Sequence, residues 1–130
     1  MNKPFSLSKL ERLKSKKDIY TLFLTGKAFF VFPFKIYFLL KDADGTEYPS
    51  KFGASVPKKI FKHAVDRNRL KRLMREIFRT NKLELNELLV AQQKRMDIMM
   101  VYTHKEILLF HELMPAVELS IKKLKHSIQN

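Results

Sequence analysis

The chain has 130 residues, and its 26 lysine and arginine residues against 13 acidic residues give a formal charge of +13 at pH 7. This length fits a single domain with one hydrophobic core, which we expect to cover residues 1–130. So large a positive charge is typical of proteins that bind a phosphate backbone, with an anionic membrane surface as the weaker alternative. The absence of cysteine excludes disulfides, Cys-ligated zinc and thiol catalysis.

No segment of the sequence has the character of a membrane span or an export signal. The longest apolar run, residues 28–34, is far shorter than the roughly 20 residues that a spanning helix needs. The amino end carries charges where a signal peptide would be apolar. We therefore expect a cytoplasmic protein that does not contact a membrane.

The amino-terminal part predicts an arm followed by a short helix. Residues 1–12 have no clear periodicity and are predicted to form a flexible or extended arm. A helix is expected from Ser15 or Asp18 to Thr25, and Gly26 would end it at the C′ position. Its hydrophobic positions are Ile19, Leu22 and Phe23.

Residues 28–40 are rich in aromatic and β-branched side chains and predict a short strand, a break near Pro33 and a longer strand. Alternation in the longer strand predicts two faces, Lys35, Tyr37 and Leu39 on one and Ile36, Phe38 and Leu40 on the other. Phe38 is assigned to the core. For Tyr37 both a core position and base stacking stay open.

The next strand is expected at residues 47–56. Asp44 and Gly45 form a tight-turn dipeptide, so this strand should return antiparallel to the one before it. Pro49 cannot donate a hydrogen bond within a sheet, and so it predicts an irregular start or an edge position.

A strongly basic amphipathic helix is predicted from His63 or Ala64 to about Asn81. Its apolar stripe is Leu70, Leu73, Met74, Ile77 and Phe78. Nine lysines and arginines against two acidic residues lie in residues 58–79, a density that favours nucleic-acid binding over an ordinary solvated face. Glu76 is expected to pair with Arg72 or Arg79 rather than to act as a general base.

The carboxyl-terminal part predicts three elements. Leu85, Leu88 and Leu89 indicate a further helical turn or two, and residues 97–103 indicate a strand. Pro115 is placed in the first turn of a closing amphipathic helix. The expected fold is α+β, an α-β-β-β-α-β-α sandwich with helices packed on a small sheet.

The sequence contains no recognisable catalytic constellation. The four histidines lack metal-ligand spacing, and three scattered glycines cannot form a phosphate-binding loop.

The basic helix contains Arg67-Asn68-Arg69 followed by Lys71-Arg72. Around this motif stand Phe52, Gly53, Ala54, Ser55, Val56, Lys58, Lys59, residues 64–72, Arg75 and Glu76. This set closely resembles the signature of the bacterial ribonuclease P protein family, whose hallmark is the Arg-Asn-Arg followed by Lys-Arg.

This resemblance implies the same order of elements around a small four-stranded sheet, as in a domain of one ribosomal protein. It also implies that the crossover from the strand ending at Val56 to the strand at Ile98 is left-handed, against the general rule for parallel connections.

The resemblance further implies a subunit without catalytic residues that assists an RNA in removing the 5′ leader of precursor tRNA by metal-assisted hydrolysis. The expected cofactor is Mg²⁺, held mainly by the RNA and not by a protein site. We expect one monomeric protein bound to one catalytic RNA and to precursor tRNA.

Residue by residue, the resemblance predicts two surfaces. The residues expected to meet the catalytic RNA are Lys58, Lys59, Arg67, Asn68, Arg69, Lys71, Arg72 and Arg75. The residues expected to line the leader-binding cleft are Ile19, Phe23, Tyr37, Ser55 and Lys59. The chain departs from the family at Ile19, a position that is often aromatic, and in the loop at residues 61–63, which is one residue longer.

Two other functions remain as alternatives. A structural RNA-binding protein of ribosomal type would share the charge and the fold but bind no leader. A helix-turn-helix DNA regulator is disfavoured, because strands surround the basic helix where that motif needs a partner helix.

Overall fold

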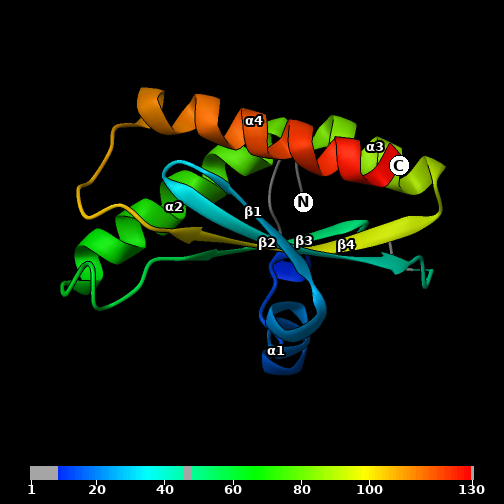
Figure 1. Cartoon of the computed structure of the whole chain (residues 1–130), viewed down its shortest axis with the longest axis horizontal. Coiled ribbons are helices and arrows are strands. Elements are labelled where there is room, and N and C mark those ends of the chain that lie inside the picture. The colour runs from blue at the N-terminus through cyan, green and yellow to red at the C-terminus, as the bar shows by residue number, and fades with distance from the viewer. Residues whose placement is uncertain (1–8, 46–47, 130) are drawn as a thin grey trace.

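A computed structural model describes residues 9–45 and 48–129 and shows a four-stranded sheet with helices on both faces (Figure 1). The elements are a 3-10 helix Lys9–Glu11, α1 Lys16–Thr25, β1 Lys27–Val31, β2 Phe34–Asp42, β3 Ser50–Ser55, α2 Ala64–Asn81, α3 Leu83–Ala91, β4 Lys94–Tyr102 and α4 Phe110–Gln129. The predicted order of helices and strands is confirmed, with α3 as the expected extra turns. Among the described residues, no helix combines the length and hydrophobicity needed to span a bilayer.

The strand order is β1-β2-β4-β3, with β2 antiparallel to β1 and β4, and β3 parallel to β4. Gly45 has φ +87°, a backbone conformation that favours glycine, and β3 does run antiparallel to β2. The two strands are not paired, however, because β4 lies between them. Most of β4 is buried, including consecutive residues from Met96 to Met100, so it occupies the interior of the sheet. β3 takes an edge, as Pro49 predicts.

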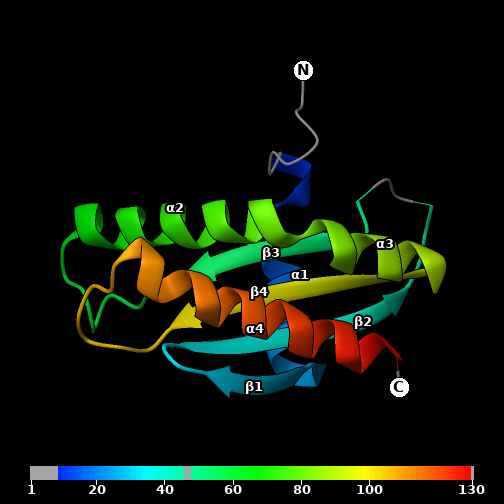
Figure 2. The same ribbon diagram turned by 90° about the horizontal axis from the view of Figure 1, so that it is seen from above.

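The β3-to-β4 connection is left-handed. Figure 2 shows the sheet from the side of α2, α3 and α4, with β3 and β4 running in the same direction. If Figure 2 is turned so that these two strands point upwards, a right-handed crossover would place β4 to the right of β3. The chain instead leaves β3, passes through α2 and α3 above the sheet and enters β4 on the left of β3. The handedness implied by the family resemblance is confirmed, although the general rule predicts the other hand.

α1 begins and ends with recognisable local chemistry. The Ser15 hydroxyl accepts a hydrogen bond from the Asp18 amide at 3.2 Å, which caps the helix. Gly26 follows the helix as predicted, but its φ of −77° is not left-handed. Glycine is needed there because a Cβ would lie 2.5 Å from the Leu22 carbonyl oxygen and 2.7 Å from that of Phe38.

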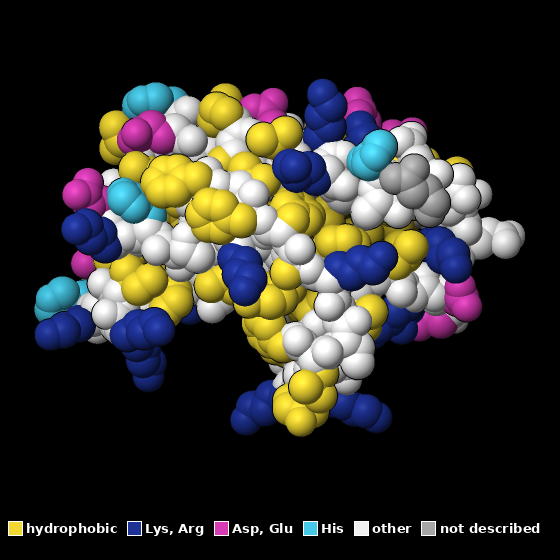
Figure 3. Space-filling model, viewed as in Figure 1, with side chains coloured by type: hydrophobic (Ala, Val, Ile, Leu, Met, Phe, Trp, Pro, Cys, Tyr) yellow, Lys and Arg dark blue, Asp and Glu magenta, His cyan; other side chains and the backbone are white. Residues whose placement is uncertain are grey.

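Only α1 and the segment before it cover one face of the sheet among the described residues, and we call this the open face. Its cluster of buried hydrophobic residues is Leu13, Leu22 and Met99. Figure 3 shows hydrophobic side chains at the exposed end of α1 with Lys or Arg side chains on both sides. Tyr20 and Leu24 on this helix are exposed.

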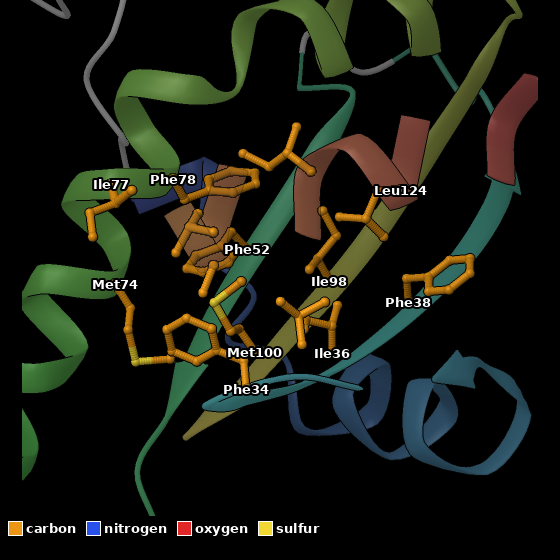
Figure 4. Close-up of a cluster of buried hydrophobic side chains, with 14 of the residues drawn as sticks. Phe34, Ile36, Phe38, Phe52, Met74, Ile77, Phe78, Ile98, Met100 and Leu124 are labelled. Carbon is orange, nitrogen blue, oxygen red and sulfur yellow. The ribbon is translucent and has the colours of Figure 1, made fainter. Parts of the chain in front are cut away.

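Three helices, α2, α3 and α4, cover the other face, which we call the closed face. Figure 4 shows its core, in which side chains from β2, β3 and β4 meet those from α2 and α4. Phe52 of β3 stacks on Phe78 of α2 with ring centroids 4.2 Å apart. This contact fixes the position of α2 on the sheet. Ile36 and Phe38 also lie on this face, as predicted.

α4 begins five residues before Pro115, so the prediction that Pro115 lies in the first turn is wrong. The Glu112 carboxylate accepts a hydrogen bond from the Leu109 amide at 2.9 Å and thereby caps the helix upstream. Pro115 then stands in the second turn and is exposed there.

Candidate nucleic-acid interface

α2 presents an apolar stripe to the core and polar residues to solvent. Leu70, Met74, Ile77 and Phe78 are buried, whereas Asn68 and Arg72 on the opposite side are exposed. The stripe therefore fixes the rotation of the helix about its axis, and with it the direction of the basic side chains.

The predicted RNA-contact residues of α2 do not all lie on one side. At about 100° per residue, Asn68, Arg72 and Arg75 fall within roughly 60° of each other. Arg69 lies about 120° from Arg75 on the flank away from Arg67 and Lys71. One flat RNA surface could contact the first three together, but not all six.

Arg67 has a structural role in addition to any contact with RNA. Its Nη1 donates hydrogen bonds of 2.8 Å to the carbonyl oxygens of both Phe61 and Lys62. These bonds tie the turn after β3 to the first turn of α2. Lys58 and Lys59 lie exposed in that turn.

Glu76 forms an ion pair with Arg79, which confirms one of its two expected partners. The hydrogen bond from Arg79 lowers the pKa of Glu76 and so keeps the carboxylate ionised. Among the described residues, no carboxylate forms an ion pair with Arg72. The charge of Arg72 is thus available to an anion.

A groove of about 370 Å³ lies along the β3 edge of the sheet, where the amino-terminal segment and α1 of the open face meet β3 and α2, and we call it the α1–β3 groove. Its lining is Arg12, Leu13, Lys14, Ile19, Phe23, Phe52, Gly53, Ala54, Ser55, Arg75 and Met99. Gly53 allows Met99 to pack closely against β3, because a Cβ there would lie 2.6 Å from Cε of Met99. The floor is apolar and the three charged lining residues are all cations.

The structure brings together most, but not all, of the predicted leader cleft. Ile19, Phe23 and Ser55 line the groove. Tyr37 adjoins it, since its ring contacts that of Phe23 edge to face with centroids 4.5 Å apart. Lys59 is not among the described residues that line the groove.

The Phe23 and Tyr37 pair lies on the open face, where Tyr37 packs against the smaller buried cluster, and base stacking by Tyr37 stays a prediction. Phe23 is 45% exposed, and Tyr37 is half-buried on the open face. The Lys35 ammonium lies 5.0 Å from the centre of the Tyr37 ring. Tyr37 is therefore outside the main core, where an aromatic ring and a cation adjoin an apolar groove.

Sequence reasoning missed Arg12 and Lys14, because the segment that carries them has no periodic pattern. The part of the predicted arm that the structure describes, residues 9–12, is a 3-10 helix followed by a bridge between Arg12 and Phe52. The Leu13 amide also donates to the Phe52 carbonyl oxygen at 3.0 Å. Residues 1–8 of the arm lie outside the described residues.

A buried ion pair between Glu11 and Lys82 holds this segment in place. Glu11 comes from the 3-10 helix and Lys82 from the junction of α2 and α3, and both residues are buried. Two partners so far apart in the sequence could not be paired from local patterns. Their contact places Arg12 and Lys14 beside α2.

The cations around the groove repel one another. Burial lowers the pKa of Arg75, and the charges of Arg12 and Arg72 lower it further. The buried Nε of Arg12 has no hydrogen-bond partner among the described residues. An anion such as a phosphate at the rim of the groove would offset the repulsion between these cations.

Among the described residues, no three His, Asp or Glu side chains gather closely enough to hold a metal ion together. The expectation that Mg²⁺ is held mainly by the RNA stays a prediction.

Comparison with known proteins identifies the family. The family model of ribonuclease P matches residues 7–124. The ribonuclease P protein component of Porphyromonas gingivalis is 37% identical over 124 residues, covering 95% of this chain and 90% of the relative. That of Nitrosococcus oceani is 39% identical over 77 residues, covering 59% of this chain and 61% of the relative.

Solved structures agree with the sequence comparison. The ribonuclease P protein of Thermotoga maritima has a TM-score of 0.66 at 30% identity and covers 87% of this chain and 96% of its own. A Staphylococcus aureus ribonuclease P protein, at 24% identity and a TM-score of 0.68, supports the fold, with 90% of each chain covered. The basic helix, the adjoining groove and these matches together establish that the chain belongs to the ribonuclease P protein family.

Proposed function

We propose that this chain is the protein subunit of a ribonuclease P holoenzyme, in which a catalytic RNA removes the 5′ leader of precursor tRNA. The observation that carries the proposal is the position of the α1–β3 groove directly beside the basic face of α2, with Arg75 belonging to both. Arg75 thus connects the groove proposed for the leader with the face of α2 proposed for the catalytic RNA.

The catalytic RNA is assigned to the exposed side of α2. Asn68 and Arg72 are exposed, and Arg75 lies on the same side of the helix. Arginine presents a planar set of donors that fits phosphate oxygens, and clustered arginines gain affinity through release of counterions. Lys58 and Lys59 extend this charge beyond the amino end of the helix.

The leader of precursor tRNA is assigned to the α1–β3 groove. Ile19 and Met99 provide an apolar floor, and the exposed Phe23 offers a ring on which an unpaired base can stack. Arg12, Lys14 and Arg75 at the rim would hold the phosphates of the same strand. This arrangement suits single-stranded RNA, whose bases are free to turn inward while its backbone stays outside.

The role of the protein is to bind and orient, and the RNA carries out the hydrolysis. Mg²⁺, held mainly by the RNA, would supply the activated water or stabilise the developing charge. By binding the leader, the protein would raise the affinity of the holoenzyme for its substrate and lower the Mg²⁺ concentration at which the RNA acts. We expect one protein per RNA, and a cytoplasmic location stays a prediction.

Reconstitution tests the proposal. The purified chain is added to its cognate ribonuclease P RNA at low Mg²⁺, and cleavage of precursor tRNA is followed. We expect the protein to accelerate cleavage and Arg72→Ala to reduce this effect. If the chain binds the RNA but leaves cleavage unchanged at every Mg²⁺ concentration, a structural RNA-binding role replaces the proposed one.

A further inference from the structure

A second basic depression lies at the opposite edge of the molecule from α2. It has a volume of about 790 Å³ and lies between β1 and the carboxyl-terminal half of α4, and we call it the β1–α4 groove. β1 contributes Lys27 and Phe29, and α4 contributes Lys122, Lys123 and His126. Figure 3 faces this side and shows separate Lys or Arg side chains around hydrophobic ones.

The β1–α4 groove has the composition of a nucleic-acid contact. No carboxylate is among the described residues that line it. The Lys123 ammonium lies 6.0 Å from the centre of the Phe29 ring, and Leu119 is 45% exposed at the same site. Cations therefore surround an apolar floor. Protein surfaces that bind RNA often have this composition, because the cations hold phosphates and the apolar floor packs against sugars or nucleobases.

The position of this groove separates it from the α2 face. β1 and β3 are the two edges of the four-stranded sheet. At a strand spacing of roughly 4.8 Å these edges are about 14 Å apart, and α2 lies over the β3 side. A rigid RNA segment on the exposed side of α2 cannot reach the β1–α4 groove without passing around the protein.

We propose that the β1–α4 groove binds a second segment of the ribonuclease P RNA, distinct from the segment bound by α2. The inference rests on the proposed function. Charge decides the occupant: the whole chain carries +13, so a second copy would be repelled across this lysine-lined face, whereas a phosphate backbone is attracted. The protein thereby links two parts of one RNA.

Salt-dependent binding of the cognate ribonuclease P RNA tests the proposal with three single variants. Lys27→Gln and Lys123→Gln each remove one charge from the groove, and Lys105→Gln removes one from an exposed turn elsewhere. Each groove variant should lower the slope of log affinity against log salt by about 1 and weaken binding roughly five- to eightfold near 0.1 M salt. Lys105→Gln should leave the slope unchanged, and melting temperatures should show all three folded.

Cross-linking locates the RNA segment. Because the chain has no cysteine, a single introduced cysteine can carry one photoreactive label at a known place. The three variants are Lys123→Cys in the β1–α4 groove, Val65→Cys in the first turn of α2 and Lys105→Cys in the turn used as a control. We expect labels at positions 123 and 65 to cross-link different nucleotides of the ribonuclease P RNA, and the label at 105 to give little product.

The outcomes separate this inference from the proposed function. If Arg72→Ala weakens RNA binding while both groove variants match Lys105→Gln, the inference is wrong and the proposed function stands. If the label at position 123 cross-links only precursor tRNA, or cross-links only an acidic protein added in place of the RNA, the assigned occupant is wrong. If the unmodified chain does not bind the RNA at all, both fail.

Discussion

The two faces of the sheet are built from alternating residues of the same strands, yet they differ in how completely they are covered. On the closed face, three helices bury an extended core that includes Ile36 and Phe38. On the open face, only a small cluster of Leu13, Leu22 and Met99 forms a buried hydrophobic core among the described residues, and the neighbouring Tyr37 is half-buried. Side-chain alternation thus gives one strand a stabilising face and a face that is free to bind.

The difference teaches where substitutions should act. Changes on the closed face should alter the free energy of unfolding, because they leave cavities in a packed core. Changes on the open face and on the outside of α2 should alter RNA affinity while the protein stays folded. A closed-face variant that changes only RNA affinity, or an open-face variant that changes only the free energy of unfolding, would contradict this division.

The largest effect is expected from Phe52→Ala on the closed face. Phe52 is 1% exposed and stacks on Phe78, so its removal should lower the free energy of unfolding by about 3–5 kcal/mol. Urea denaturation measures this loss, and Phe52→Leu, which keeps most of the volume, should lose less. A loss below about 1 kcal/mol for Phe52→Ala would mean that the stacked pair is not central to the core.

The next largest effect is expected at the ion pair between Glu11 and Lys82, which connects the amino-terminal segment on the open face to the helices of the closed face. Lys82→Ala removes the ammonium partner of the buried Glu11 carboxylate, which should cost about 3 kcal/mol, at the low end for buried pairs because the amino-terminal segment can detach and rehydrate the carboxylate. Detachment also removes Arg12 and Lys14 from the groove, so leader affinity should fall.

The double variant Glu11→Gln with Lys82→Met is the control for this pair. It removes both charges and should recover most of the lost stability. Equal melting temperatures for the unmodified chain and Lys82→Ala would show that the pair does not hold the segment.

On the open face, Phe23→Ala should weaken binding of precursor tRNA to the holoenzyme by about 1–3 kcal/mol, the usual contribution of one stacked base. Phe23 is almost half exposed, so the melting temperature should change little. Leu24→Ala, at a more exposed position of the same helix, is the matched control for affinity and stability. A large loss of stability with unchanged affinity would instead assign Phe23 to the core.

The smallest effects distinguish two arginines of α2. Arg72→Ala should lower the salt slope of RNA binding by about 1 without destabilising the protein, because Arg72 is exposed. Arg67→Ala should also lower the melting temperature, because its two hydrogen bonds to the turn are lost. Identical behaviour of the two variants would remove the structural role given to Arg67.

Much of the fold follows from local patterns in the sequence. The stripe from Leu70 to Phe78 predicts α2 and its orientation, and alternation around Tyr37 predicts which residues of β2 share a face. The pairing of β3 could not be predicted in this way, because Asp44 and Gly45 specify a reversal and not the neighbouring strand. The start of α4 was missed because Glu112 caps the helix upstream of Pro115.

The site was predicted less completely than the fold. Ile19, Phe23 and Ser55 meet in one groove, although they come from separate elements, and the family resemblance was needed to group them. Arg12 and Lys14 were missed because a bridge to Phe52 and a buried ion pair position them, and both are contacts between distant parts of the chain.

The most direct test of the open face as a binding surface is the dependence of holoenzyme affinity on leader length. Precursor tRNAs with a leader of one nucleotide and of several nucleotides are titrated with the holoenzyme carrying the unmodified chain or Phe23→Ala. We expect the longer leader to bind more tightly to the unmodified holoenzyme and to lose most of this advantage with Phe23→Ala. Affinity that does not change with leader length would contradict the assignment of the α1–β3 groove to the leader.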